Sequence, residues 1–203
     1  MDLARMIERK VQVDGICNII IAGGTCSGKT TLANYLQSRL SKEFSVSLIK
    51  QDDYYKDIQD VPKIRDGYLM DSPNAFHSSE FRQDAEKLLL EGKTIAPRYD
   101  MAQNKRISKD IPINRSQVNI FEGLHTLSML EGLPDSLAIF LDTPLDVCLE
   151  RRINRDTELY GVPIERVREN FNDCIAPMYH SYIAPQMEKA EVKMEGVDLC
   201  GTA

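Results

Sequence analysis

The chain has 203 residues, a length that suggests one domain or one domain with a small appendage. Its hydrophobic fraction of 42% is enough for a packed core, and its net charge of −6 argues against a protein devoted to nucleic acid. No apolar run is long enough to cross a bilayer or to form a signal peptide. Five cysteines without C-x-x-C spacing, and three histidines apart from them, predict reduced thiols and no zinc site. We therefore expect a cytoplasmic protein with neither nucleic-acid nor membrane partners.

Residues 1–13 predict a short helix or arm, and the apolar run at 16–22 predicts the first strand. The next residues fit G-x-x-x-x-G-K-S/T, the phosphate-binding P-loop, and leucines at helical spacing follow over 31–40. Glycines let successive N–H groups point at an anion, Lys29 brings charge to the outer phosphates, and Thr30 offers a hydroxyl to Mg²⁺. The predicted nucleotide-binding residues are Gly23, Gly24, Thr25, Cys26, Ser27, Gly28, Lys29, Thr30 and Thr31.

The second predicted strand, at 46–49, runs into the acidic pair Asp52 and Asp53. In a parallel α/β sheet, functional residues collect beyond the carboxyl ends of strands. Adjacent side chains diverge on an extended backbone, so one acid can face the nucleotide and metal while the other faces solvent. Spacing alone does not choose between them. The irregular polar stretch at 56–77 is too long for an idle connection and predicts a substrate-covering loop.

Residues 78–91 predict a helix that is capped by Ser78 or Ser79 and ended by Gly92. Residues 93–113 contain short extended pieces around a polar turn at Gln103 and Asn104. This pattern predicts a β-hairpin that projects from the main sheet.

Two further strands, at 117–123 and 136–142, carry acids at their ends. Glu122 is a candidate to hold the Mg²⁺ water shell, with a structural cap or an ion pair as the alternative. Asp142 precedes Thr-Pro and is interpreted as a helix N-cap.

The C-terminal part is predicted to be mostly helical. Pro144 opens a helix from 145 to about 156, residues 157–162 break it, and a helical stretch over 163–190 is interrupted near Pro177 and Pro185. An edge strand at 190–194 follows. Strands that alternate with helices predict an α/β fold, a P-loop-type parallel sheet flanked by helices.

Three arginines share the helix that begins at 145. Arg151 and Arg155 lie on one face and Arg152 lies beside it. They form either a solvated basic face paired with Glu150 and Asp156, or a lid that supplies cations to a transferring phosphate.

Together these motifs resemble the uridine kinase family of P-loop kinases, whose relatives include phosphoribulokinase and nicotinamide riboside kinase. The matching stretches keep the family order across residues 16–195: the P-loop, QDDYYK at 51–56, MDSPNAF at 70–76, PRYD at 97–100, FEG at 121–123, and FLDTPLD at 140–146 leading into RRINRD at 151–156.

The resemblance implies one kinase domain over 1–203, with a substrate-side hairpin at 93–113 and a helical lid at about 151–172. Its implied activity is transfer from ATP or GTP, with Mg²⁺, to the 5′-hydroxyl of a nucleoside such as uridine or cytidine. Asp52 is implied as the catalytic base, assisted by Lys29 and Arg155, and the metal residues are Thr30 and Glu122. The implied substrate residues are Tyr55, Asp71, Tyr99, Arg106 and Arg152. Homo-oligomerisation is left open.

Two departures from the family pattern leave the acceptor open. Asn104 stands where a base-reading His is usual, and the lid reads Leu159-Tyr160-Gly161-Val162 without the two arginines of Glu-Arg-Gly-Arg. Nicotinamide riboside, a phosphorylated sugar, and nucleotide binding without turnover are the alternatives. A GTPase switch is disfavoured because no Asn-Lys-x-Asp is present. His125 is either a substrate contact or a structural residue.

Overall fold

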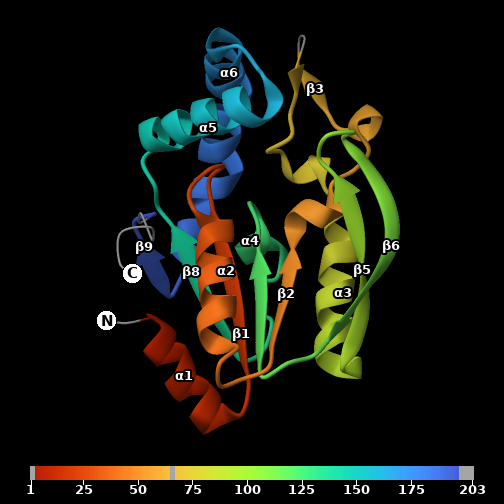
Figure 1. The fold of residues 1–203 in the computed structure, drawn as a ribbon, viewed down its shortest axis with the longest axis vertical. Helices are drawn as coiled ribbons and strands as arrows, with labels where there is room; N and C mark the ends of the chain where they lie inside the picture. Colours follow the sequence, from red (N-terminus) through yellow and green to blue (C-terminus); the bar gives the residue numbers. More distant parts are fainter. Residues whose placement is uncertain (1–2, 65–66, 197–203) are drawn as a thin grey trace.

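The computed structural model describes residues 3–64 and 67–196, and a five-stranded parallel sheet forms its centre (Figure 1). The strand order is β2–β7–β1–β8–β9. These strands are β1 (Cys17–Gly23), β2 (Val46–Lys50), β7 (Val118–Glu122), β8 (Ser136–Leu141) and β9 (Val192–Met194). The predicted α/β fold is confirmed, including the short edge strand β9.

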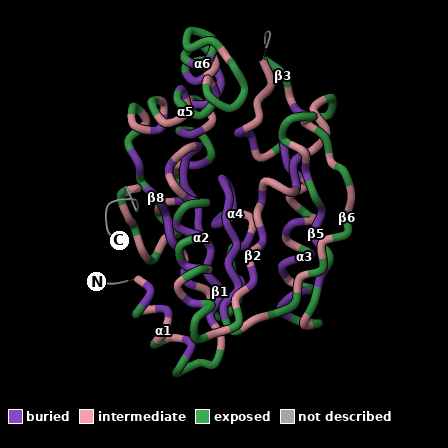
Figure 2. Tube along the Cα trace, viewed as in Figure 1, coloured by how far each residue is buried: buried purple, intermediate pink, exposed green. Residues whose placement is uncertain are grey.

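Helices cover both faces of this sheet: α1 (Leu3–Asp14), α2 (Lys29–Leu40), α3 (Ser78–Glu91) and α4 (Thr126–Met129). Successive side chains of β1 point to opposite faces of the sheet. Ile19 and Ile21 pack in a cluster with α1 and α2, whereas Ile20 packs in a second cluster with α3 and α4. Both faces are therefore buried, as the tube in Figure 2 shows for the central strands. Double-sided burial explains the nearly continuous apolar run.

The hairpin forms a separate two-stranded antiparallel sheet from β5 (Lys93–Asp100) and β6 (Lys105–Asn114). It lies beside α3 (Figure 1). Asn104 in its turn has a φ of 49°, a left-handed conformation that asparagine tolerates better than most residues. The predicted hairpin is confirmed.

The 3-10 helix η1 (Gln51–Tyr54) leads into the predicted substrate-covering loop. The loop itself holds four short elements: η2 (Ile58–Asp60), β3 (Lys63–Ile64), β4 (Gly67–Tyr68) and η3 (Pro73–Ala75). A bridge between Tyr55 and Phe76 closes the base of the excursion, so both its ends are fixed next to the sheet.

Helix α5 (Leu145–Tyr160) is longer than predicted. The expected break at 157 is wrong, because the helix runs on to Tyr160 and the Gly161 N–H donates to the Thr157 carbonyl at 3.1 Å. It ends at Gly161, whose φ of 64° provides a left-handed C-cap.

Two predicted N-caps are also wrong. Pro144, with no side-chain cap, occupies the position before α5, and the Asp142 N–H instead bonds the Met194 carbonyl at 2.8 Å in β9. Ser78 is the first residue of α3 after His77, and its hydroxyl donates to the Pro73 carbonyl at 3.3 Å.

Beyond α5 the chain alternates between turn types: α6 (Ile164–Asn170), the π-helix η4 (Phe171–Ile175), α7 (Ala176–Met178), the π-helix η5 (Tyr179–Ile183) and the 3-10 helix η6 (Ala184–Lys189). At Pro177 the helical backbone continues, so the predicted interruption there is a change of helix type and not a break. At Pro185 the chain tightens into the 3-10 helix η6. Within the part of the chain that the structure describes, no helix has the length and apolar character of a membrane span.

Candidate active site

The P-loop joins β1 to α2 through a tight turn. Gly28 has a φ of 101° and Cys26 a φ of 54°, both in the left-handed region. The Ser27 N–H donates to the Gly24 carbonyl at 3.2 Å, and the Lys29 ammonium donates to the same carbonyl at 2.6 Å. The loop thus wraps around the Lys29 side chain, which lines the cleft described below.

Gly23 permits the close approach of the loop to strand β8. A Cβ at this position would lie 2.7 Å from the Leu141 carbonyl oxygen and 2.8 Å from the Ser27 hydroxyl. We expect Gly23→Ala to cost about 2 kcal/mol of stability, because a rigid backbone atom must move, and to weaken nucleotide binding. Chemical denaturation and calorimetric titration with MgADP measure the two effects, and Gly132→Ala, where the added Cβ meets nothing within 4 Å, controls for the loss of a glycine at positive φ.

Glu122 and Thr30 meet at the carboxyl end of the sheet. Parallel pairing places Glu122 of β7 opposite Ile21 of β1, and the Thr30 hydroxyl donates to Glu122 Oε1 at 3.1 Å. Burial raises the pKa of Glu122, the Asp52 charge raises it further, and Lys29 opposes both. A carboxylate and a hydroxyl are oxygen ligands of the kind that Mg²⁺ takes, so these two residues fit the ion that accompanies a nucleotide.

The structure gives Asp52 and Asp53 different surroundings, which sequence spacing alone does not predict. Asp52 lines a cleft of about 1000 Å³ together with Lys29 and Thr30. Burial raises the pKa of Asp52, and the charges of Lys29 and Arg155 oppose that shift. Asp53 Oδ1 instead accepts the Tyr99 N–H of β5 at 3.4 Å. Asp52 therefore faces the cleft, and Asp53 anchors the hairpin.

Helix α5 presents Arg151, Arg152 and Arg155 to the same cleft. The Arg152 guanidinium donates to the Thr25 hydroxyl at 2.8 Å, and its Nε lies 3.2 Å from Asp156 Oδ2. Arg155 Nε donates to Asp156 Oδ1 at 2.8 Å. The predicted pairing with Asp156 therefore occurs, and it holds the largely buried Arg152 and the more exposed Arg155 at the cleft.

On the opposite wall, Asp71 and Tyr55 also line the cleft. Asp71 is 4% exposed, and its Oδ2 has no hydrogen-bond partner among the described residues. Burial raises its pKa, and the charge of Arg152 is the largest opposing influence. A buried carboxylate oxygen that has no partner favours a ligand that donates a hydrogen bond there.

Two predicted substrate residues lie outside the cleft wall. Tyr99 lies behind Tyr55, with ring centroids 5.5 Å apart, and its hydroxyl donates to the Lys56 carbonyl at 3.3 Å. Arg106 makes a bidentate pair with Glu80, at 2.7 and 2.8 Å, which lowers the pKa of Glu80 to about 2. These placements give no support to direct substrate contact by either residue.

Several cleft residues had no assigned role in the sequence patterns. They are Met70, Met101, Ala102, Leu124, Tyr160 and Val162. Tyr160 and Val162 lie in the segment that was expected to break the helix. Asn104, noted because it departs from the family pattern, also lines the cleft.

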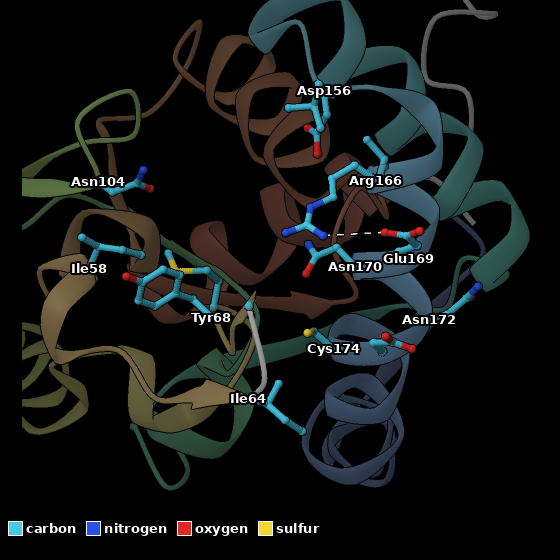
Figure 3. Close-up of a pocket in the computed structure, with 15 residues that line it drawn as sticks. Ile58, Ile64, Tyr68, Asn104, Asp156, Arg166, Glu169, Asn170, Asn172 and Cys174 are labelled. Atoms are coloured by element: carbon cyan, nitrogen blue, oxygen red, sulfur yellow. Dashed lines mark ion pairs between the residues drawn. The ribbon is translucent and has the colours of Figure 1, made fainter.

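A second chamber of about 800 Å³ adjoins this cleft and shares Met70, Asn104, Asp156 and Val162 with it. Figure 3 shows Ile58, Tyr68 and Asn104 on one side of it, across from Arg166 and Asn170 on the other. Arg166 Nη1 lies 3.7 Å from Glu169 Oε2, an ion pair within α6. The lining residues are Ile58, Ile64, Gly67, Tyr68, Met70, Asn104, Asp156, Val162, Arg166, Val167, Glu169, Asn170, Asn172, Asp173 and Cys174.

Solved structures share this architecture. A putative fructose transport system kinase from Silicibacter sp. TM1040 aligns with a TM-score of 0.70, over 95% of this chain and 96% of its own, at 20% identity. A possible uridine kinase from Bacillus stearothermophilus aligns with a TM-score of 0.62, over 96% and 100% of the two chains, at 17% identity. The fold is that of the P-loop kinases.

The sequence comparison narrows this class to a family. Residues 18–202 match the Phosphoribulokinase / Uridine kinase family, and the chain belongs to it. The uridine kinase of Ligilactobacillus salivarius is 35% identical over 178 residues, which cover 85% of this chain and 81% of that protein. Uridine kinase-like protein 5 of Arabidopsis thaliana is 35% identical over 176 residues, which cover 85% of this chain but only 37% of that longer protein.

Proposed function

We propose that this protein is a nucleoside kinase that transfers the terminal phosphoryl group of ATP or GTP, with Mg²⁺, to the 5′-hydroxyl of uridine or cytidine. One observation carries the proposal: Asp52 lines a single cleft together with Lys29 and Thr30 of the phosphate-binding loop and with Asp71 and Arg152, the residues assigned to the acceptor. The uridine kinases among its relatives agree with this acceptor class.

Each group has a defined part in this proposal. Lys29 and the P-loop amides hold the phosphates, while Thr30 and Glu122 hold the metal. Mg²⁺, when bound, neutralises charge that develops on the phosphates. Asp52 accepts the proton of the acceptor hydroxyl as that oxygen attacks, and Arg155 stabilises the charge on the transferring group.

The acceptor side of the cleft orients the sugar and the base. Asp71 Oδ2, buried and available, accepts hydrogen bonds from ribose hydroxyls, and the adjoining chamber holds the base. The amides of Asn104 and Asn170 offer both donors and acceptors to a base edge. An amide pair of this kind suits uracil and cytosine without strong discrimination between them.

The charges of the chamber give a second candidate acceptor. The guanidinium of Arg166 lines the chamber and pairs with Glu169, and the lining Asp156 pairs with Arg152 and Arg155. Because these cations already face carboxylates, the chamber disfavours a phosphorylated sugar and favours a neutral or positively charged base, so nicotinamide riboside is the alternative acceptor.

An acceptor panel tests the proposal. The protein is incubated with MgATP or MgGTP and with uridine, cytidine, a purine nucleoside, nicotinamide riboside or ribulose 5-phosphate, and ADP or GDP release is followed. We expect release to be stimulated by uridine and cytidine. Stimulation by nicotinamide riboside alone selects the second candidate, and no stimulated release with any acceptor contradicts the nucleoside-kinase proposal.

We expect the pH–rate profile of the reaction to fall at low pH, in an acid limb that reports the protonation of Asp52. The base must be ionised to accept a proton, and burial raises its pKa. The rate should therefore fall as the pH falls through a value above about 4, the ordinary pKa of an aspartate. The pH profile of kcat/KM measures this limb, and a limb at or below pH 4 would show that Asp52 is not the group being titrated.

A further inference from the structure

The turn after β7 connects three carboxylates that come from distant parts of the chain. Gly123, Leu124 and His125 follow Glu122 directly and lead into α4. Gln51, which precedes Asp52, and the carbonyl of Asp71 both contact this turn. Neither Gln51 nor His125 lines the cleft.

Gln51 lies against the turn from the β2 side. It is 0% exposed, its Oε1 accepts the His125 N–H at 2.9 Å, and its Nε2 donates to Met129 Sδ at 2.9 Å. A Cβ on Gly123 would overlap both Cβ and Oε1 of Gln51, so only glycine leaves room for the carboxamide. This contact joins the residue before Asp52 to the residue after Glu122.

His125 lies against the acceptor loop from the other side of the turn. It is 2% exposed, and its Nε2 lies 2.9 Å from the Asp71 carbonyl oxygen. Burial lowers the pKa of His125 to about 4, so the ring is neutral at pH 7. Since a carbonyl only accepts, Nε2 carries the proton and donates it. The ring also meets Phe76 edge-on, with centroids 5.6 Å apart.

We propose that Gln51 and His125 are positioning residues of this kinase that do not touch substrate. Through the turn 123–125 they hold Asp52 and Asp71 at the cleft and Glu122 against Thr30, which lines it. Gln51 fixes the distance between the proposed base, Asp52, and the proposed metal ligand, Glu122. His125 fixes the position of the backbone at Asp71, whose carboxylate is proposed to bind the ribose. The assignment to catalysis rests on the proposed function, whereas the hydrogen bonds themselves can be tested without turnover.

The first test reads the His125 ring directly. In ¹⁵N-resolved NMR of the whole protein, His125 should stay neutral and protonated on Nε2 at every pH down to about 5, because its donor bond and its burial both favour that state. An imidazole that titrates near pH 6.5, or one protonated on Nδ1, overturns the proposed contact.

The second test removes the donor but keeps the ring. We expect His125→Phe to raise the acceptor KM about tenfold while the affinity for MgADP is unchanged, because the displaced residue is Asp71. His125→Gln restores a donor at similar reach and should recover most of the loss. His180→Phe, at an exposed histidine, is the matched control. A His125→Phe variant that loses thermal stability but keeps a wild-type acceptor KM would show a merely structural role.

The third test addresses Gln51. Gln51→Met should lower kcat and should reduce, about tenfold, the factor by which Mg²⁺ improves ADP affinity in calorimetric titrations, because Glu122 shifts. Gln83→Met, at an exposed glutamine on α3, is the matched control. An unchanged Mg²⁺ factor would overturn the assignment of Gln51. If the wild-type protein phosphorylates no acceptor, the proposed function fails, while the NMR and ADP measurements still decide the positioning role.

Discussion

Replacing Asp52 with Asn is expected to lower kcat by about 10³-fold while leaving MgADP affinity within a few-fold of wild type. The amide keeps the size of the side chain but cannot accept the hydroxyl proton. Asp52 lines the cleft with Lys29 and Arg155, whose charges favour its ionised form. Phosphoryl transfer is followed with the best acceptor of the panel, and nucleotide binding by calorimetry.

Asp53→Asn provides the matched comparison. Asp53 accepts the Tyr99 N–H through Oδ1, a contact that the oxygen of an asparagine can retain. We expect this variant to keep kcat within about tenfold of wild type, since no proton-transfer role is removed. If Asp53→Asn abolished transfer and Asp52→Asn did not, the assignment of the base would be reversed.

Replacing Asp84 with Ala is expected to give the largest loss of stability, about 3 kcal/mol. Asp84 is 5% exposed and accepts from three neighbours: the Tyr54 hydroxyl at 3.0 Å, the Thr94 hydroxyl at 3.2 Å, and the Lys109 ammonium at 2.9 and 3.0 Å. The change leaves two buried hydroxyls without their acceptor. The Lys109 ammonium is partly exposed and stays hydrated after the change. The expected loss of stability therefore lies at the low end of the range for breaking a buried ion pair.

Urea denaturation of the whole chain measures this loss. Asp84→Asn, which keeps an acceptor oxygen, should cost roughly half as much. Glu86→Ala on the same helix removes only an exposed pair with Arg82 and should change stability by less than about 1 kcal/mol. Equal losses for Asp84→Ala and Glu86→Ala would show that the Asp84 network does not hold the hairpin to α3.

The sequence was informative where the chemistry is local. The P-loop, the strand before it and the helix after it follow from residues within one short stretch, and the structure places them as predicted. The hairpin likewise follows from extended pieces around one turn. Glu122 reaches Thr30 because parallel pairing aligns strand ends, which the sheet type already implied.

The sequence did not predict the placement of side chains whose partners lie far away in the chain. Asp52 and Asp53 are neighbours of identical type, and only the hairpin backbone that binds Asp53 separates them. Arg106 fits a family pattern, yet Glu80 of α3 holds it away from the cleft. The contact of Gln51 with Gly123 joins two segments that no local pattern connects.

Direct identification of the product tests the central claim best. Wild-type protein and Asp52→Asn are each incubated with MgATP and uridine or cytidine, and the products are resolved by ³¹P NMR and mass spectrometry. We predict a nucleoside 5′-monophosphate that forms in step with ADP from the wild-type protein and falls to background with the variant. ADP that appears with inorganic phosphate and no phosphorylated nucleoside, or a product yield that Asp52→Asn leaves unchanged, would contradict this account.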